Sequence, residues 1–460
     1  MTGAPDDLVE RLQRHGQAHV LRFLDRLEPG PAAALVAQLQ ALDLDRLQRL
    51  IEAVLRPAAP PPGDVAPPEL AEWGEGDEHR RRDAEARERG AELLAQGKVA
   101  AFLVAGGQGT RLGYDGPKGR YPVGPLTRRS LFAYHAQRVL ATSRRYGAPA
   151  PLYVMTSEAN HASTLAAFEE AGGFGLQPDQ VRLFPQGMLP AIDREGRLLL
   201  ASRDSLALSP DGHGGSFTAL QRSGALADMA ERGIEQIFYF QVDNPLAPVL
   251  DPVFIGLHAG AGAQMSTKVV AKSDPDEKVG VVARLDGATG VIEYSDLPAD
   301  LARSRDEQGR LAFRAGNIAI HMIERAFVEQ LLSSGLELPV HRADKQVACV
   351  DAEGRVIEPT GPNAIKMEMF VFDALPRAAV SVTQEVRRED EFAPVKNASG
   401  ADSPDTARQA LSDQAHRWIA AAGLSAPREL AEVGPLFALD AEEFQRNLTR
   451  SDFGPVFDRS

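Results

Sequence analysis

The stretch VAAFLVAGGQGTRLGYDGPKG, residues 99–119, decides how the rest of the chain is interpreted. It opens with a continuous apolar run, which is typical of a strand buried in a parallel sheet. Five glycines then precede Lys118, with Arg111 among them. Glycine can adopt backbone angles that other residues avoid, and without a side chain its amide can approach a ligand closely. Because successive amides curled in this way bind anions, we predict a strand followed by an anion-binding loop.

Two common phosphate-binding patterns do not fit this loop. The Walker pattern needs a Gly-Lys pair followed by Ser or Thr, whereas Lys118 stands between Pro117 and Gly119. The dinucleotide pattern needs a glycine where this chain has Leu112. The loop therefore predicts an anion site of another kind, in which Arg111 and Lys118 supply positive charge. A glycine-rich turn without a ligand is the weaker alternative, and Lys118 by itself could equally be a surface lysine.

The organisation of the chain predicts an α/β protein with extensions at both ends. Residues 6–55 are predicted to be helical, with caps at Asp6 or Asp7 and at Asp43, and with a break at Gly30 and Pro31. A proline-rich linker (57–68) and a charged helix follow. From residue 98, apolar runs alternate with helical segments, which predicts a largely parallel sheet with ligands at the carboxyl ends of its strands. We expect a helical arm with linker at 1–90, a catalytic domain at 91–385 and a small domain at 386–460.

Composition excludes several classes of function. The chain has 460 residues and a formal net charge of −14, so a general nucleic-acid binder is not expected. No apolar run reaches the length of a membrane span, and the N-terminus lacks a signal-peptide pattern, so we expect a cytoplasmic protein. The one cysteine, Cys349, is expected to be buried and inert. Trp73 and Trp418 are expected to be packing residues rather than stacking platforms.

A family resemblance is carried by the glycine loop and by eight further blocks in order. LVAGGQGTRLG followed by GPKG resembles the signature loop of the eukaryotic-type UDP-N-acetylhexosamine pyrophosphorylases, which are nucleotide-sugar pyrophosphorylases. The other blocks are FPQGMLPAI (184–192), SPDGHGG (209–215), VDNPL (242–246), VGVVARLDG (279–287), VIEYSDL (291–297), AGNIAIH (315–321), PNAIKMEMFVFD (362–373) and REDEFAPVKN (388–397). The resemblance implies a Rossmann-like (GT-A-like) nucleotidyltransferase domain with a mixed, mostly parallel sheet, a helical N-terminal arm and a small α+β C-terminal domain.

The resemblance also implies a reaction. UTP and N-acetylglucosamine 1-phosphate would give UDP-N-acetylglucosamine and pyrophosphate by in-line displacement at the α-phosphorus, with Mg²⁺ or Mn²⁺ as cofactor. The same chemistry on glucose, galactose or N-acetylgalactosamine 1-phosphate is an alternative, and a non-catalytic UDP-sugar sensor is another. The expected partners are these small molecules alone, with no nucleic acid and no membrane. We expect a monomer, although an oligomer is left open.

The resemblance assigns roles to residues in three groups. Those expected to act in catalysis are Arg111, Lys118 and Lys396. Those expected to bind the nucleotide are Ala105, Gly106, Gly107, Gln108, Gly109, Thr110, Gln186, Gly187, Gly212, Asp243 and Lys366, and Asp243 is also the expected metal ligand. Those expected to face the sugar are His213, Glu293, Tyr294 and Asn317. From the residues alone, Asp243 could instead cap a turn, and Lys366 and Lys396 could be surface lysines.

The sequence departs from the family at two places. Where the N-acetylhexosamine branch usually has asparagine, this chain has His213, and histidine there is similar to the UDP-glucose and broad UDP-sugar branches. Because histidine can titrate near neutral pH, we expect a pH effect on sugar phosphate binding between pH 6 and 8. The C-terminal region is shorter than in the family, and it contains no repeat that would form a β-helix.

Overall fold

The computed structural model describes residues 3–56, 63–335, 337–425, 427–448 and 455–458. Contacts within the chain group it into two compact units. The first comprises Met1–Pro60, Gln186–Ser216 and Glu337–Asp373, and the second comprises Pro61–Pro185, Phe217–Leu336 and Ala374–Ser460. The N-terminal helices therefore join two segments from the middle of the chain. The division at residues 90 and 385 stays a prediction.

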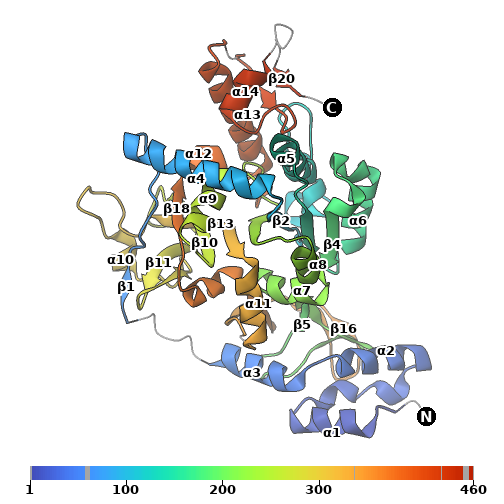
Figure 1. Cartoon of the computed structure of the whole chain (residues 1–460). Helices are drawn as coiled ribbons and strands as arrows, with labels where there is room; N and C mark the ends of the chain where they lie inside the picture. Colours follow the sequence, from blue (N-terminus) through green and yellow to red (C-terminus); the bar gives the residue numbers. More distant parts are fainter. Residues whose placement is uncertain (1–2, 57–62, 336, 426, 449–454, 459–460) are drawn as a thin grey trace. The chain divides into compact units, whose positions relative to one another are not determined.

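Three helices open the first unit: α1 (Asp6–Arg14), α2 (Pro29–Gln40) and α3 (Leu44–Leu55) (Figure 1). The expected cap is present at α3, where the Asp43 side chain accepts a hydrogen bond from the Arg46 amide at 2.9 Å. Asp6 and Asp7 do not cap α1, because Pro5 precedes the helix and both acids lie in its first turn. The first helix was expected to reach Gly30. It ends instead at Arg14, because Gly16 takes a φ of 68° and short 3₁₀ turns follow.

Pairs of short strands make up the rest of the first unit. They are β5 (Met188–Pro190) with β8 (Leu208–Pro210), β6 (Leu200–Ser202) with β7 (Ser205–Leu206), β14 (Val340–Lys345) with β17 (Ala364–Met369), and β15 (Cys349–Val350) with β16 (Val356–Ile357). Gln17 ties the helices to these strands, because its amide donates to the Gly196 carbonyl and accepts from the Leu198 amide. Cys349 is buried, and burial raises the pKa of its thiol, as expected for an inert residue.

A mixed sheet of ten strands forms the second unit (Figure 1). Its main order is β1-β11-β13-β9-β2-β3-β4, while β10 pairs with β13 and β18, and β12 pairs with β11. The strands are β1 (Val65–Ala66), β2 (Val99–Val104), β3 (Leu152–Thr156), β4 (Val181–Pro185), β9 (Gln236–Gln241), β10 (Met265–Ala271), β11 (Val281–Leu285), β12 (Ala288–Ile292), β13 (Ala315–Glu324) and β18 (Thr383–Val386). β9, β2, β3 and β4 run parallel, and β13 runs antiparallel to β9. This α/β architecture confirms the predicted fold class.

The predicted linker is only partly a linker. Its residues 57–62 lie outside the described part of the chain. Val65 and Ala66 are not linker but form β1, which pairs antiparallel with Leu285 and Arg284 of β11. This pairing extends the sheet at its edge, and a local count of prolines could not reveal it.

Helices cover the sheet and pack closely at glycines. They include α4 (Asp77–Ala95), α5 (Leu131–Tyr146), α6 (His161–Glu170), α7 (Ser216–Arg222), α8 (Ala225–Glu231), α9 (Pro252–Gly260), α10 (Ala299–Arg303) and α11 (Arg325–Ser333). A methyl group on Gly90 of α4 would collide with the Pro252 carbonyl, and one on Gly256 of α9 would collide with the Ala86 carbonyl. The two helix backbones therefore touch directly. Within the described residues, no helix is long and apolar enough to cross a lipid bilayer.

The C-terminal segment is anchored by a buried carboxylate. It contains α12 (Arg388–Glu391), α13 (Pro404–Ala421), α14 (Ala441–Asn447), and the parallel pair β19 (Glu432–Val433) and β20 (Val456–Phe457). Glu432 accepts hydrogen bonds from the amides of Leu126 and Thr127, from the Thr127 and Tyr134 hydroxyls and from Arg129. These donors lie shortly after the glycine loop, so the C-terminal segment braces the chain that leaves it.

Candidate active site

The glycine loop begins where β2 and β9 end side by side, with Val104 opposite Gln241. Two carbonyls of the loop are fixed by one side chain, because the Asn160 Nδ2 donates to the Ala105 carbonyl at 2.9 Å and to the Gly107 carbonyl at 3.2 Å. The Lys118 amide also donates to the Gly107 carbonyl, at 3.1 Å. The amides of Gly106, Gly107 and Gln108 have no acceptor among the described residues. These backbone donors are therefore available to an anion.

The backbone angles of the loop glycines differ from those that the sequence led us to expect. Gly106, Gly107 and Gly109 do not adopt positive φ, whereas Gly113 and Gly116 do, at 67° and 120°. Close approach is what requires Gly109, because an added Cβ would lie 2.9 Å from the Tyr114 carbonyl oxygen. The expectation of special backbone angles at the first three glycines was wrong, since the chain reverses further along the loop.

Lys118 and Asp243 come together at the strand ends. Lys118 begins a short 3₁₀ turn (Lys118–Arg120), and Asp243 follows β9 by two residues. Their charged atoms, Nζ and Oδ2, are 3.7 Å apart, and the two side chains are 18% and 15% exposed. Arg111, in the turn Thr110–Leu112, is exposed and has no side-chain partner in the described ranges. One cation thus faces the carboxylate while the other stays unpaired.

Two of the residues expected to face the sugar, Asn317 and Glu293, lie next to Gly280 at the same edge of the sheet. β13 runs antiparallel to β9, so its beginning, with Asn317, lies where β9 ends. The Asn317 amide donates to the Gly280 carbonyl at 2.8 Å, and Glu293 Oε1 would be 3.5 Å from a Cβ placed on Gly280. Asn317 Oδ1 accepts from the Ala319 amide at 3.0 Å, while its Nδ2 has no acceptor among the residues described. The Tyr294 side chain, next to Glu293, is 46% exposed.

Lys396 lies close to Asp243 along the backbone but has its own partner. The Val395 amide donates to the Asp243 carbonyl at 2.9 Å. The Lys396 ammonium is 3.6 Å from Asp402 Oδ2, and its side chain is 44% exposed. Any catalytic role for Lys396 therefore requires that it exchange this exposed pair for a substrate, and the role stays a prediction.

The remaining nucleotide residues form a second group within the first unit. Gln186 Nε2 donates to Asp211 Oδ1 at 3.3 Å and to the Gly212 carbonyl at 3.4 Å. Gly212 has a φ of 84°, and a Cβ there would lie 2.7 Å from the Met369 nitrogen, so only glycine fits. Lys366 lies on β17 opposite Ala343 and is half-buried. The structure thus brings Gln186, Gly187 and Gly212 together around Asp211.

His213 is neutral in its surroundings, contrary to expectation. Its Nδ1 accepts a hydrogen bond from the Val371 amide at 3.1 Å, and its ring stacks on Phe370 with the centroids 5.2 Å apart. Burial, together with the nearby His341, lowers the pKa of His213 to about 4. The expected titration between pH 6 and 8 is therefore wrong, because this ring stays unprotonated there.

Sequence reasoning missed two supporting residues. Asn160 holds the carbonyl side of the glycine loop, and Asp211 accepts the Gln186 amide beside Gly187. Asn160 stands shortly after the end of β3, so a search of strand ends could have found it. Asp211 lies inside the quoted block PDGHGG, where only the glycine and histidine received roles.

Asp243 is the carboxylate that could bind a metal ion at the edge of the sheet beside the glycine loop, and it does not form a full set of protein ligands by itself. Within the described ranges, no group of three or more His, Cys, Asp or Glu residues could hold a metal ion. Mg²⁺ is commonly bound by one or two carboxylates together with substrate phosphates. A lone, partly exposed Asp243 beside unpaired backbone amides fits that mode of binding.

Expectations about the tryptophans divide. Trp418 packs against the buried cluster formed by α13, α14 and β20, as predicted. Trp73 does not pack, because it is 45% exposed and carries the Arg387 guanidinium over its ring at 5.2 Å. Its surroundings are distinct from the strand edge described above.

Comparison with known proteins gives matches over most of the chain. Residues 74–452 match the family described as UTP--glucose-1-phosphate uridylyltransferase. The human protein named UDP-N-acetylhexosamine pyrophosphorylase-like protein 1 is 42% identical over 436 residues, covering 91% of this chain and 86% of its own. UDP-N-acetylglucosamine diphosphorylase 2 of Arabidopsis thaliana is 37% identical over 454 residues, covering 95% and 88%. The crystal structure of the Trypanosoma brucei uridine diphosphate N-acetylglucosamine pyrophosphorylase with an inhibitor is 28% identical and has a TM-score of 0.84, covering 99% and 98%.

Proposed function

The chain belongs to the UTP--glucose-1-phosphate uridylyltransferase family, and from this premise we propose that it transfers a uridylyl group from UTP to N-acetylglucosamine 1-phosphate. The names of the human and Arabidopsis relatives support this sugar. The observation that carries the proposal is the strand edge where Lys118 faces Asp243 beside unpaired loop amides.

The chemistry is a single displacement. A phosphate oxygen of the sugar 1-phosphate attacks the α-phosphorus of UTP, the bond from that phosphorus to the bridging oxygen breaks, and pyrophosphate leaves. The attacking oxygen is already an anion, so no general base is needed. The protein must hold two polyanions in line and offset charge on the transferring phosphoryl group.

The residues at the strand edge suit these tasks. The amides of Gly106, Gly107 and Gln108 donate to the triphosphate, and the exposed Arg111 binds its outer phosphates. Lys118 is largely shielded from solvent, so its charge acts on the α-phosphate with little screening. A bound Mg²⁺ would neutralise phosphate charge, and Asp243 is the residue that would hold it.

The sugar is chosen by hydrogen bonding. Glu293 accepts from sugar hydroxyls. The Nδ2 of Asn317 donates to the N-acetyl carbonyl, because its oxygen is already occupied by the Ala319 amide. A donor left without this acceptor disfavours glucose 1-phosphate, which lacks the acetyl group. His213 takes no part in this choice through charge, since its ring is neutral.

A substrate panel tests the proposal. The protein is given UTP and Mg²⁺ with the 1-phosphates of N-acetylglucosamine, N-acetylgalactosamine, glucose or galactose, and pyrophosphate release is measured. We expect the highest kcat/KM with N-acetylglucosamine 1-phosphate. A higher value with glucose 1-phosphate would contradict the sugar assignment. Binding of UDP-N-acetylglucosamine without pyrophosphate release would instead support a sensor.

An isosteric variant tests the selectivity argument. Asn317→Asp keeps the oxygen that accepts from Ala319 but removes the amide donor. We expect kcat/KM for N-acetylglucosamine 1-phosphate to fall by about tenfold more than that for glucose 1-phosphate, the cost of one hydrogen bond. Equal losses with both sugars would remove Asn317 from sugar selection.

A further inference from the structure

The second unit contains a cleft that the proposed reaction does not use. Its volume is about 790 Å³, within the range of small-molecule pockets. It is lined by the segment after β10, by residues 305–314, by the end of β18 with the start of α12, and by Trp73 and Glu75. None of the residues assigned to uridylyl transfer lines it. The cleft is therefore a separate place on the same unit.

Positive charge dominates its lining, although the whole chain carries a formal charge of −14. Six of the lining residues are cationic and three are acidic. The cations are Lys272, Arg305, Arg310, Arg314, Arg387 and Arg388. A concave surface focuses the field of its charges, so the cations that keep an unpaired charge can act on an anion in the cleft.

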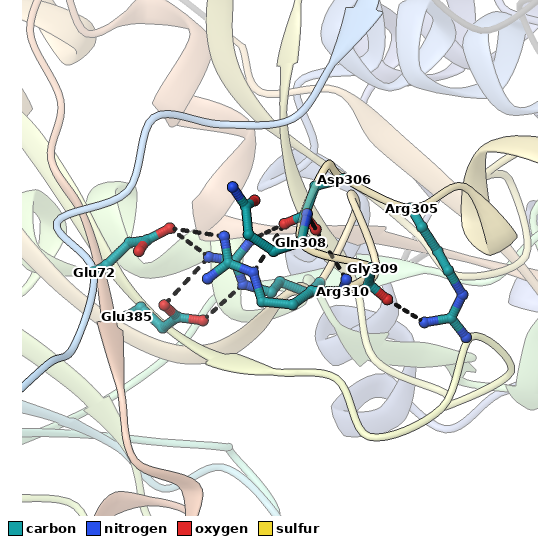
Figure 2. Close-up of polar contacts among 8 residues, drawn as sticks. Glu72, Arg305, Asp306, Gln308, Gly309, Arg310 and Glu385 are labelled. Atoms are coloured by element: carbon teal, nitrogen blue, oxygen red, sulfur yellow. Dashed lines mark hydrogen bonds and ion pairs between the residues drawn. The ribbon is translucent and has the colours of Figure 1, made fainter.

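Most of the arginines that line the cleft form ion pairs with carboxylates. Arg314 pairs with Glu385 at 3.0 Å and with Glu72 at 2.7 Å, and Arg310 pairs with Asp306 at 2.9 Å. Figure 2 shows Glu72 and Glu385 on one side of this network, with Asp306 holding the tight turn that leads to Arg310. These pairs position the arginines but leave them partly neutralised.

Two cations of the lining have no carboxylate within ion-pair distance among the described residues. Lys272 is only 7% exposed, and its Nζ donates to the Pro275 carbonyl at 3.0 Å. An ammonium has three donors, so two of them find no acceptor in the part of the protein that the structure describes. Among the described residues, the Arg305 guanidinium donates only to the Gly309 carbonyl, at 2.6 Å. Figure 2 shows this guanidinium turned away from Glu72 and Glu385.

A largely buried ammonium that forms no direct ion pair among the described residues is stabilised when a ligand brings a negative charge to it. Burial lowers the pKa of Lys272, which shows that its surroundings disfavour the charge, even though the acids of the following loop act in the opposite direction. An anion bound in the cleft would reverse this effect. The exposed Trp73 adds an aromatic surface to the same lining, with Arg387 over its ring.

We propose that this cleft binds a phosphorylated small molecule, whose phosphoryl oxygens accept from Lys272 and Arg305. Arginine and lysine together suit an anion with several oxygens, and the cleft is large enough for a nucleotide or a sugar phosphate. The shared chemistry is the phosphoryl group. A comparison of UMP with pyrophosphate, described below, decides whether the ligand also carries a nucleobase.

Trp73 provides a direct probe. Trp418→Phe leaves Trp73 as the one tryptophan of the chain, so its fluorescence reports on the cleft. The full-length variant is titrated at constant ionic strength with inorganic pyrophosphate, with UMP and with citrate. We expect a saturable change with pyrophosphate or UMP and a weaker one with citrate. Tighter binding of UMP than of pyrophosphate would mean that the ligand carries a nucleobase.

Matched variants locate the binding. Lys272→Met is expected to weaken the apparent affinity by about tenfold or more, as for loss of one charge-assisted hydrogen bond. Lys278→Met, on the same loop but exposed and outside the lining, should leave it unchanged. Arg305→Gln, at an exposed position, gives a second reading if Lys272→Met does not fold.

A third variant separates this site from the proposed active site. Lys118→Ala should not alter the titration of Trp73, and no turnover is measured, so the result is independent of the proposed reaction. The proposal is overturned if no probe gives a saturable change, if citrate binds as tightly as the phosphates, if Lys272→Met and Lys278→Met behave alike, or if Lys118→Ala abolishes the signal.

Discussion

Replacing Lys118 with alanine separates a catalytic lysine from a merely structural one. Its Nζ is 3.7 Å from Asp243 Oδ2, and both side chains are largely buried. If Lys118 stabilises charge on the α-phosphate, turnover should fall by about a hundredfold or more, which corresponds to about 2.7 kcal/mol of lost transition-state stabilisation.

The effect on folding should be much smaller. With an effective dielectric constant of about 20, the Coulomb energy of charges at this separation is roughly 4.5 kcal/mol before desolvation is subtracted. Both side chains keep some contact with solvent, so desolvation offsets most of that energy, and the net contribution of the pair to the free energy of unfolding is about 1 kcal/mol. For a chain of 460 residues, a loss of that size lowers the melting temperature by only about 1 °C, since the entropy of unfolding is about 2.1 cal/mol/K per residue.

The assay is pyrophosphate release from saturating UTP and N-acetylglucosamine 1-phosphate, accompanied by a thermal melt of each variant. Lys278→Ala serves as the matched control, because that lysine is exposed and has no side-chain partner in the described ranges. Asp243→Asn and the double variant complete a mutant cycle. We expect Lys118→Ala to be slow in both backgrounds, since its action on phosphate does not depend on the aspartate.

Two results would refute this reasoning. Turnover near that of the wild type in a folded Lys118→Ala protein would remove the lysine from the reaction. If Asp243→Asn keeps measurable turnover, a double variant no slower than Asp243→Asn alone would show that Lys118 serves only to neutralise the carboxylate. The second outcome would leave uridylyl transfer standing but reassign the cation that acts on the α-phosphate.

Four further predictions concern titration and packing. From pH 6 to 8 the KM for sugar phosphate should have the same pH dependence in the wild type and in His213→Asn, because the pKa of about 4 keeps the ring neutral. The pKa of His213 in the folded protein lies below the ordinary value of 6.5. The stability due to the neutral ring is therefore complete above pH 6.5 and is lost as the pH falls toward 4. The free energy of unfolding of His213→Asn, measured in urea, should lack this loss. Glu432→Gln should lower the free energy of unfolding by about 3 kcal/mol or more, because a buried anion with several donors is removed, whereas the exposed Glu429→Gln should not; equal melting temperatures would contradict the brace. Gly90→Ala should cost about 1–3 kcal/mol by forcing α4 from Pro252, while Gly30→Ala, which meets open space, should be neutral or stabilising in the same melt.

Much of the fold and part of the proposed site could be predicted, because they depend on short segments of the sequence. The apolar run ending at Gly106 is β2, and the run ending at Val242 contains β9. Strand ends in an α/β sheet meet at one edge, so the meeting of Lys118 and Asp243 follows from the pattern. The end of the first helix was placed wrongly, because Gly16 has the same local propensity to end a helix as the Gly30 that was chosen. The second helix begins at Pro29 and has Pro31 in its first turn, as predicted.

By itself, the sequence determined the strand and glycine loop and the order of the family blocks, and from these blocks the residues of the proposed site are predicted. Only the tertiary structure decided that Asn160 holds the loop carbonyls, that the His213 ring is neutral, and that Lys272 lies buried in a cationic cleft beside an exposed Trp73. The reason is that the pKa of a side chain and its hydrogen-bond partners are set by groups brought from distant parts of the chain. Local patterns record which groups a residue carries, but not which groups will surround it.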